Sequence, residues 1–449
     1  MNKYIPVIGL EVHVELKTKS KMFCGCSADY FGAEPNTHTC PVCLGLPGAL
    51  PVPNEVAIDW CRKIGLALNC ELLKSSKFDR KNYFYPDLAK GYQISQYDKP
   101  FCLKGSITLG SGKVIGITRV HMEEDTAKLA HQSGIQNSNV KSQNYSLVDF
   151  NRSGVPLVEI VTEPDFDNAQ DVVDYLKKLQ QIVRYLGVSN ADMEKGDMRL
   201  EPNISLRRVG ETGLPKYKVE VKNINSFSFV AKAIEFEIKR QTEILDKGQV
   251  PAQETRGWNE TKNATVSQRS KEDAQDYRYF PEPDIPEISI LADQIDQMRS
   301  ELSELPHEKV KKFEGWAVKK ADARILAETK EMAEFFESTV EHARKHEVLP
   351  QDVANYIVNH KVDITTVLPT HIIEEIKGKK VGMISDESEL EKIAKEVISE
   401  NPGFVEAYKK GKLTVIQALV GAVMKKTLGK ADASKAKTIL EKLLNPEVS

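Results

Sequence analysis

Short stretches in which apolar and polar residues alternate recur through the first two thirds of the chain. The clearest are rich in β-branched residues and lie at residues 7–16, 114–122, 155–162 and 217–222. Such alternation predicts strands that bury one face. Residues 54–69 and 167–187 instead predict helices, the second with apolar positions at a period near 3.6. Because the two patterns do not alternate regularly, we expect an α+β fold with a largely antiparallel sheet.

A proline-rich passage at residues 280–286 ends this mixed region, and the pattern beyond it is almost entirely helical. Residues 323–345 predict one long amphipathic helix. Acidic residues after Asp386 open a further helix, because carboxylates stabilise a helix N-terminus. The sequence therefore predicts a sheet domain at residues 1–290, a helical linker at 291–377 and a C-terminal helical domain at 378–449.

The composition is that of an ordinary globular protein: 449 residues, 41% hydrophobic and 28% charged, with a net charge of −3. These values argue against disorder and against a uniformly basic nucleic-acid binder. From Glu406 onward, however, nine lysines occur with only four acidic residues. This excess predicts either a module that contacts phosphates or a solvated lysine face. With no long apolar run and no targeting segment, we expect a cytoplasmic protein without a membrane partner.

Four of the seven cysteines lie close together, with Cys24 and Cys26 followed by Cys40 and Cys43. Two short knuckles of this kind supply four thiolates, which close a tetrahedron around Zn²⁺ and leave no open position. We therefore expect a structural zinc site, and the alternative is a coincidence of buried cysteines. The remaining three cysteines stand apart and are expected in the core.

Two strand patterns carry carboxylates that repel one another unless a cation is near. Residues 8–16 alternate so regularly that Glu11, His13 and Glu15 share one face. Three consecutive acids at residues 123–125 place like charges on both faces of a second strand. Carboxylates with one imidazole are suitable ligands for Mg²⁺ or Mn²⁺. The alternative is a pair of half-exposed strands whose polar residues meet solvent.

Three more stretches, at residues 149–161, 199–207 and 219–226, place acidic, basic or amide residues between apolar ones. Several such strands in one region predict a sheet with a concave polar face that holds a charged substrate. Arg278 lies among tyrosines and either binds a phosphate or belongs to a loop that its aromatic residues anchor.

No GxxxxGK[ST], HExxH, GxSxG or GxGxxG motif is present. Residues 110–113 lack the flanking residues of a phosphate-binding loop and predict a hairpin turn. A nucleotide would therefore be held by metal and carboxylates rather than by a glycine-rich loop.

Nine separated motifs carry a family resemblance. They occupy residues 11–16, 21–23, 40–48, 81–87, 91–96, 121–125, 149–152, 219–223 and 276–284. In this order they resemble the B subunit of the aspartyl/glutamyl-tRNA(Asn/Gln) amidotransferase, over essentially the whole chain. Residues 200–202 and 125–127 depart from the family's usual pattern.

The resemblance implies a cradle-shaped catalytic domain similar to glutamine synthetase and guanido kinases, followed by helical domains of which the last contacts tRNA. It implies a ligase that forms carbon–nitrogen bonds with glutamine as the amide donor. ATP would phosphorylate the side chain of mischarged Glu-tRNA(Gln) or Asp-tRNA(Asn), and ammonia from a glutaminase A subunit would displace phosphate. A small C subunit would complete the heterotrimer.

Ten residues are expected to have roles in this reaction; the resemblance carries the first four best, and the other six follow from residue type. Four would hold Mg²⁺ against the ATP phosphates, four would be nearby ligands or supporting groups, and two would neutralise the transferring phosphoryl group. In that order they are Glu11, His13, Glu123 and Glu124; Asp125, Glu159, Asn203 and Glu220; and Lys222 and Arg278. Two alternatives stay open: a non-catalytic tRNA-binding scaffold with a zinc knuckle, and a metal-dependent ligase that acts alone.

Overall fold

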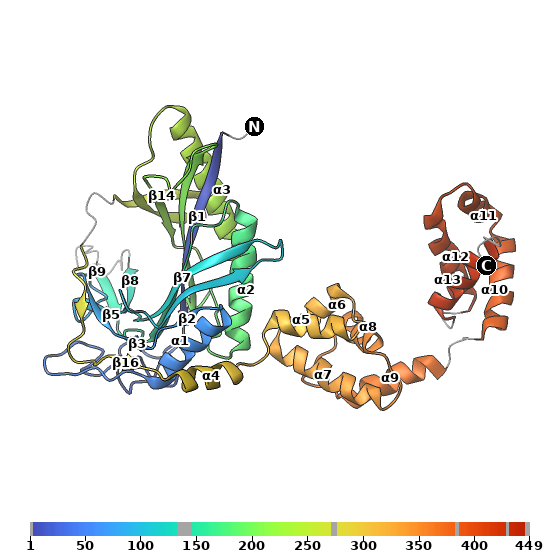
Figure 1. The fold of residues 1–449 in the computed structure, drawn as a ribbon, viewed down its shortest axis with the longest axis horizontal. Coiled ribbons are helices and arrows are strands. Elements are labelled where there is room, and N and C mark those ends of the chain that lie inside the picture. The colour runs from blue at the N-terminus through green and yellow to red at the C-terminus, as the bar shows by residue number, and fades with distance from the viewer. Residues whose placement is uncertain (1–2, 133–144, 271–275, 382–385, 428–430, 445–449) are drawn as a thin grey trace, which may run out of the picture. The chain divides into compact units, whose positions relative to one another are not determined.

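The computed structural model describes residues 3–132, 145–270, 276–381, 386–427 and 431–444 (Figure 1). Its internal contacts divide the chain into two compact units, Met1–Glu308 and Lys309–Ser449. The first unit contains one large hydrophobic core, and the second contains two smaller ones.

A nine-stranded sheet forms the centre of the first unit, in the order β14-β13-β12-β11-β1-β10-β7-β6-β2. Neighbouring strands are antiparallel except β12 and β13, which run parallel. The predicted α+β fold is therefore confirmed. The strands are β1 (Tyr4–Glu15), β2 (Glu71–Leu72), β6 (Cys102–Thr108), β7 (Val114–Glu124), β10 (Pro156–Thr162), β11 (Met198–Arg208), β12 (Val219–Lys222), β13 (Glu254–Asn259) and β14 (Ala264–Ser270).

Three helices pack against the apolar face of this sheet (Figure 1). Leu10, Val12 and Val14 of β1 point into the shared core. Asn54 and Asn168 cap two of the helices, because their side-chain oxygens accept backbone N–H groups of the first turn. The helices predicted at residues 54–69 and 167–187 are thus confirmed. The three helices are α1 (Glu55–Ala67), α2 (Ala169–Tyr185) and α3 (Phe227–Asp246).

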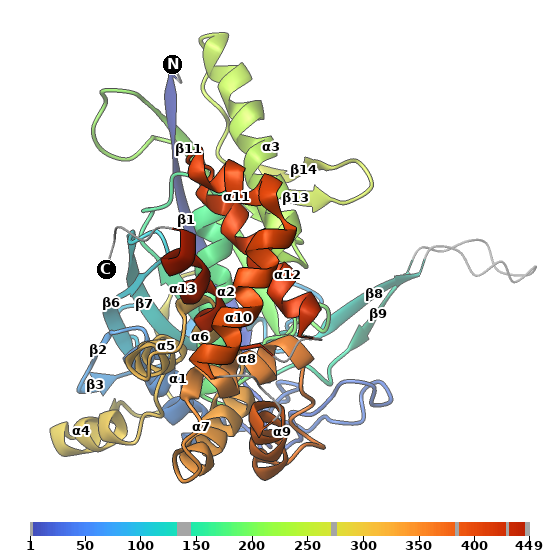
Figure 2. The ribbon, with the colours of Figure 1, turned by 90° about the vertical axis from the view of Figure 1, so that its right-hand side faces the viewer.

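Three smaller sheets complete the first unit. Figure 2 shows β8 and β9 as a hairpin that extends away from the main sheet. The turn predicted at residues 110–113 joins β6 to β7, and the Leu109 N–H closes it by donating to the Lys113 oxygen at 2.8 Å. The small sheets pair β4 (Asp79–Asn82) with β5 (Tyr92–Ser95) and β15 (Phe280–Pro281), β3 (Ser75–Ser76) with β16 (Ile288–Ser289), and β8 (Lys128–Gln132) with β9 (Tyr145–Asp149). A short helix, α4 (Ala292–Ser300), packs on the large core through Ile295 and Met298.

A core that includes Phe313 and Phe336 joins the next five helices. The single helix predicted over residues 323–345 is wrong, because the chain forms two helices there. Thr329 separates them, since its side-chain oxygen accepts the Met332 N–H at 3.2 Å and caps the second helix. Apolar positions continue on both sides of this break, which hid it from the periodicity. The helices are α5 (Pro306–Gly315), α6 (Lys320–Leu326), α7 (Lys330–Arg344), α8 (Pro350–His360) and α9 (Pro369–Val381).

The last core, which includes Leu390, Leu419 and Leu440, joins the C-terminal helices. Asp386 caps the first of them by accepting the Ser388 N–H at 2.9 Å, so the predicted helix start is confirmed. The helices are α10 (Glu387–Glu400), α11 (Pro402–Lys409), α12 (Ile416–Lys426) and α13 (Ala433–Leu444), with a 3₁₀ turn at Leu413–Val415.

Candidate active site and zinc centre

Strand register gathers charged side chains on the sheet face opposite the three helices. Because side chains alternate along β1, Val12 points into the core, whereas Glu11 and His13 point to the opposite face of the sheet. Glu11 is paired with Glu201 of β11. The neighbouring row across four strands consists of Arg199, His13, Glu159 and His121.

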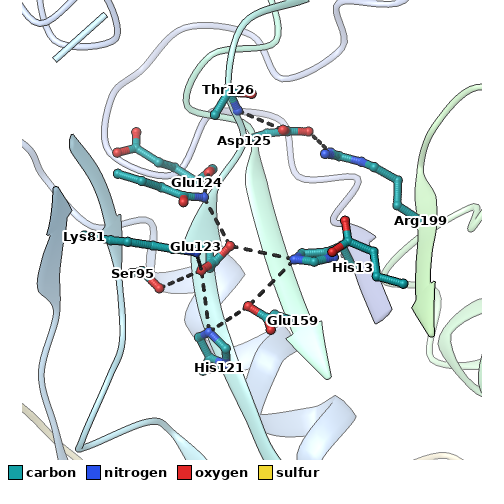
Figure 3. Close-up of polar contacts among 12 residues, drawn as sticks. His13, Lys81, Ser95, His121, Glu123, Glu124, Asp125, Thr126, Glu159 and Arg199 are labelled. Atoms are coloured by element: carbon teal, nitrogen blue, oxygen red, sulfur yellow. Dashed lines mark hydrogen bonds and ion pairs between the residues drawn. The ribbon is translucent and has the colours of Figure 1, made fainter. Parts of the chain in front are cut away.

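The first of two charged groups contains two imidazoles and two carboxylates, which point toward one another in Figure 3. His13 Nε2 lies 3.7 Å from Glu159 Oε2 and 4.0 Å from Glu123 Oε2. His121 Nε2 lies 3.2 Å from the same Glu159 oxygen and 3.6 Å from Glu123 Oε1. His13 Nδ1 is buried with no hydrogen-bond partner among the described residues. His13, Glu123 and Glu159 together present the donor atoms of a possible metal site.

Both carboxylates of this group stay ionised although they are buried. Burial alone would raise the pKa of Glu123, but Lys81 and His121 hold it well below its ordinary value. The pKa of Glu159 is lowered to about 2 against the effect of burial, chiefly by the charge of His121. The pKa of His121 is raised in turn, because the nearby carboxylates outweigh its desolvation. Ser95 steadies the group by donating to Glu123 Oε1 at 2.8 Å.

The second charged group contains Glu11, Glu201 and Glu220, which also present donor atoms within 4.8 Å of one another. Lys222 Nζ lies 2.9 Å from Glu201 and 3.6 Å from Glu220. Asn203 Nδ2 donates to Glu11 Oε1 at 3.0 Å. Burial raises the pKa of Glu11 first, and the charges of Glu159, Glu201 and Glu220 raise it further. Glu159 belongs to the first group and Glu11 to the second, so the charges of one group affect the pKa values of the other.

A cavity of about 300 Å³ adjoins the second group. Glu11 and Asn203 form part of its wall, and Lys216, Tyr217 and Lys218 form another part. The remainder is lined by apolar residues, two prolines and the polar residues Thr162, Ser205 and Gln253. The cavity thus combines apolar and polar surface with two lysines next to the second carboxylate group.

Glu124, predicted to share one Mg²⁺ with Glu11 and His13, lies outside both groups. Consecutive strand residues point to opposite faces, and Glu123 takes the position beside His13. Glu124 instead accepts the Ile94 N–H at 2.9 Å and pairs with Lys90. Of the four residues predicted to hold Mg²⁺, the structure therefore places His13 and Glu123 in the first group, Glu11 in the second and Glu124 in neither.

Asp125 and Arg278 also lie outside the two groups. Asp125 is buried between Arg199 and Arg152, which lower its pKa against the effect of burial. Glu15 shares Arg199 at 3.1 Å, and burial followed by the charge of Asp125 raises the pKa of Glu15 well above its ordinary value. Arg278 is exposed in the loop before β15.

Two members of these groups, His121 and Glu201, and one residue that contacts them, Lys81, were not among the predicted site residues. His121 precedes Glu123 by two positions, so strand alternation alone would have placed it on the same face. Glu201 follows from the same alternation beside Asn203. Lys81 lies 3.5 Å from Glu123 but comes from the small β4-β5-β15 sheet. Nothing in the local pattern indicates that this sheet lies against the end of β7.

Cys24, Cys26, Cys40 and Cys43 lie together, with sulfur atoms within 4.8 Å of one another. The Cys40 N–H donates to Cys43 Sγ at 3.1 Å. A hydrogen bond from Cys24 lowers the pKa of Cys43 to about 4, and burial raises that of Cys26 to about 11. Four converging sulfur donors could bind zinc. The other three cysteines are buried in the core, as predicted.

Two family models match the chain. The model of the GatB/GatE catalytic domain matches residues 6–296, and the model of the GatB domain matches residues 351–444. The sheet unit with its charged face is therefore a catalytic domain of the GatB/GatE class. Among the described residues, the helices fall short of the length and hydropathy that a bilayer span requires.

Full-length relatives narrow this class. The B subunit of the aspartyl/glutamyl-tRNA(Asn/Gln) amidotransferase of Dehalococcoides mccartyi is 46% identical, over 99% of both chains. The B subunits of the same name from Thermotoga petrophila and Caldanaerobacter subterraneus are each 43% identical, over 99% and 100% of this chain and 100% of their own lengths. The chain belongs to the family of aspartyl/glutamyl-tRNA(Asn/Gln) amidotransferase B subunits, which confirms the resemblance.

Proposed function

We propose that this chain activates the side-chain carboxylate of a mischarged aminoacyl-tRNA, as one component of a glutamine-dependent ligase. A carboxylate oxygen of Glu-tRNA(Gln) or Asp-tRNA(Asn) attacks the γ-phosphorus of ATP, and ADP leaves. Ammonia then attacks the activated carbonyl carbon, phosphate leaves and an amide remains. The observation that carries the proposal is the single sheet face on which two carboxylate groups lie beside histidine and lysine side chains.

His13, Glu123 and Glu159 are the first candidates to hold Mg²⁺ or Mn²⁺, and Glu11 and Glu220 are the second. At metal–oxygen distances of about 2.1 Å, the ligand atoms of an octahedral ion lie about 3 Å apart when adjacent and about 4.2 Å apart when opposite. The separations of 3.7 and 4.0 Å from His13 Nε2 fall between these two values. The ion would neutralise charge on the ATP phosphates, which is the main requirement of phosphoryl transfer.

The cavity beside Glu11 is the proposed site of the nucleoside end of ATP. Its position next to the second carboxylate group lets the phosphates extend from the cavity across the charged face. Lys222 on that face and Lys81 at its far side would stabilise charge on the transferring phosphoryl group. Arg278, which is exposed outside both groups, is left without this role.

Ammonia would come from a glutaminase A subunit, and a small C subunit would complete the heterotrimer. Acyl phosphates react with water, so the ammonia should arrive by an enclosed path. Activity of the isolated chain on free glutamate would instead favour a ligase that acts alone. We also propose a cytoplasmic location, where aminoacyl-tRNA is made and used.

The proposed C-terminal domain, residues 378–449, would contact tRNA phosphates through its lysines. Lys412 and Lys425 are exposed, whereas Lys410 pairs with Glu406 and Lys426 pairs with Glu396 and Glu400. Lys430 lies outside the described residues. Deleting this domain should weaken tRNA binding and flatten its dependence on salt. Unchanged affinity across a salt series would exclude the role.

The four cysteines would hold a structural zinc ion. Metal analysis of purified protein should find about one equivalent of zinc, and its removal by a chelator should lower the unfolding temperature. Less than about half an equivalent in carefully purified protein would count against the site.

The decisive experiment is transamidation by the reconstituted heterotrimer on both mischarged tRNAs, with ATP and glutamine each omitted in turn. Product should require both compounds. His13→Ala should abolish amidation while tRNA affinity stays unchanged, because the residue lies in the first charged group. Full activity of His13→Ala would favour the non-catalytic scaffold.

A further inference from the structure

Lys21 is buried beside the four cysteines, although lysine is seldom buried without a partner. Only 1% of the residue is exposed. Its ammonium group donates to the backbone oxygen of His38 at 2.7 Å and to that of Phe150 at 3.3 Å. Among the residues that the structure describes, no carboxylate forms an ion pair with Lys21 within 4.0 Å. The two contacts of the buried ammonium are therefore to neutral backbone oxygens and leave its charge unpaired at contact distance.

The missing anion lies at the cysteine cluster. A Cβ atom added at Gly154 would lie 3.6 Å from Cys43 Cβ, 3.6 Å from Lys21 Cδ and 3.8 Å from Glu124 Oε2, so all three side chains flank the same point. The other oxygen of Glu124 already pairs with Lys90. Zinc held by four thiolates carries a formal charge of −2. A buried charge is costly when it stands alone and stable when an opposite charge is near. The positive ammonium and the negative zinc–thiolate centre would balance each other's charge.

We propose that Lys21 is the internal counter-cation of the four-cysteine zinc centre and fastens that centre to the loop that contains Phe150. This inference rests on the zinc centre proposed above, and it makes Lys21 a positioning residue that does not ligate the metal.

The loop fastened in this way reaches the charged sheet face. Asn151 Oδ1 accepts the His38 N–H at 2.8 Å, and Ser153 Oγ donates to the Cys43 oxygen at 3.1 Å. Between them, Arg152 pairs with Asp125 at 3.5 Å. The zinc centre thereby holds the Asp125 end of β7 in place from outside the active site.

The first test compares zinc affinity in full-length variants by competition with a chromophoric chelator. Lys21→Met and Lys21→Gln remove the charge, and glutamine keeps a donor for the two backbone oxygens. Lys19→Met is the matched control, because Lys19 is an exposed lysine in the same segment. Loss of an outer partner typically weakens metal binding about 10- to 100-fold. We expect that loss for both Lys21 variants and none for the control; wild-type affinity in Lys21→Gln would overturn the proposal.

The second test separates charge balance from simple packing. Thermal unfolding is measured for Lys21→Gln and wild type, each with zinc bound and with zinc removed. We expect the substitution to lower the unfolding temperature of the zinc-bound protein and to raise that of the zinc-free protein, where the ammonium has lost its anion. A decrease of similar size in both states would overturn the proposal. Wild-type protein that purifies without zinc would overturn the zinc centre as well, so the two failures are distinguishable.

Discussion

Two buried clusters of charge in the first unit differ in how completely their polar atoms are satisfied. Glu237 of α3 is fully buried, and its carboxylate accepts hydrogen bonds from Arg240 at 2.9 and 3.0 Å and from Thr265. Arg256 completes that cluster at 3.2 Å.

The His13 group differs at one member. Its carboxylates have partners, since His121 lies 3.2 Å from Glu159 and Ser95 donates to Glu123 at 2.8 Å. His13 Nε2, however, stands 3.7 and 4.0 Å from these carboxylates, and His13 Nδ1 has no partner among the described residues.

We infer from this difference that the Glu237 cluster is structural and that the His13 group is functional. A saturated buried network leaves no site for a ligand and holds its elements together. An unsaturated buried network keeps polar atoms unpaired at a cost, and a ligand can pair them. We therefore assign the Glu237 cluster to stability and the His13 group to function, and the following changes test that division.

The largest expected effect is on activity. Glu159→Gln removes one charge from the unsaturated group, so amidation by the reconstituted heterotrimer should fall about 1000-fold, or about 4 kcal/mol in the barrier. Single-turnover amidation, expressed per folded molecule, measures this change. Chemical unfolding should show lower stability as well, because the lowered pKa of Glu159 means that its charge stabilises the folded state. A loss smaller than tenfold would show that Glu159 has no essential role in the reaction.

The second effect is on stability. Glu237→Gln breaks the saturated cluster and leaves two guanidinium groups underpaired, so the free energy of unfolding should fall by about 3 kcal/mol. Glu235→Gln, on the exposed side of α3, is the matched control and should change little. Amidation per folded molecule should stay at the wild-type rate. Inactive but fully stable Glu237→Gln protein would reverse the assignment of the two clusters.

These clusters also show where sequence reasoning succeeds. Period-two alternation placed Glu11 and His13 together on one face of β1, and the antiparallel sheet followed from irregular strand spacing. Three consecutive acids could not be assigned in the same way, because only β7 in its sheet shows that Glu123 and not Glu124 faces His13.

Contacts between segments that are distant in the sequence could not be predicted from it. Lys81 reaches Glu123 from a separate sheet, and Glu237 meets Thr265 across 28 residues. Local periodicity carries no information on such pairs, because they depend on how whole elements pack. The helix break at Thr329 was missed for a related reason: a cap and a continuous apolar face coexist there.

The third effect is the response to metal. If the unsaturated group binds Mg²⁺, the folded state should gain about 2.7 kcal/mol at 100 times the dissociation constant. Thermal unfolding across a Mg²⁺ series measures this gain in protein without ATP. His13→Ala should reduce it, whereas Glu235→Gln should retain it. If the unfolding temperature of the wild-type protein does not change with Mg²⁺ concentration, the unsaturated group does not bind Mg²⁺.

The smallest effect concerns Glu15. Its polar contacts are less complete than those of the Glu237 cluster and more complete than those of His13. Its carboxylate accepts the Tyr30 hydroxyl at 3.0 Å and pairs with Arg199 at 3.1 Å, yet it is buried near the charge of Asp125. Arg152 faces the same carboxylate and opposes the rise, but burial and Asp125 outweigh both guanidinium groups and raise the pKa of Glu15 well above 4.5.

A raised pKa means that the folded protein favours the protonated carboxyl. Its contribution to stability is complete below pH 4.5 and is lost as the pH rises through the folded pKa. Glu15→Gln imitates the protonated form, so the variant should match wild type near pH 4.5 and become the more stable protein toward pH 8. Asp125→Asn is the control of opposite sign, because the pKa of Asp125 is lowered and its charge stabilises the fold at neutral pH. Urea unfolding of the three proteins at several pH values measures the differences, and Glu15→Gln less stable than wild type at pH 8 would show that Glu15 belongs with the saturated cluster.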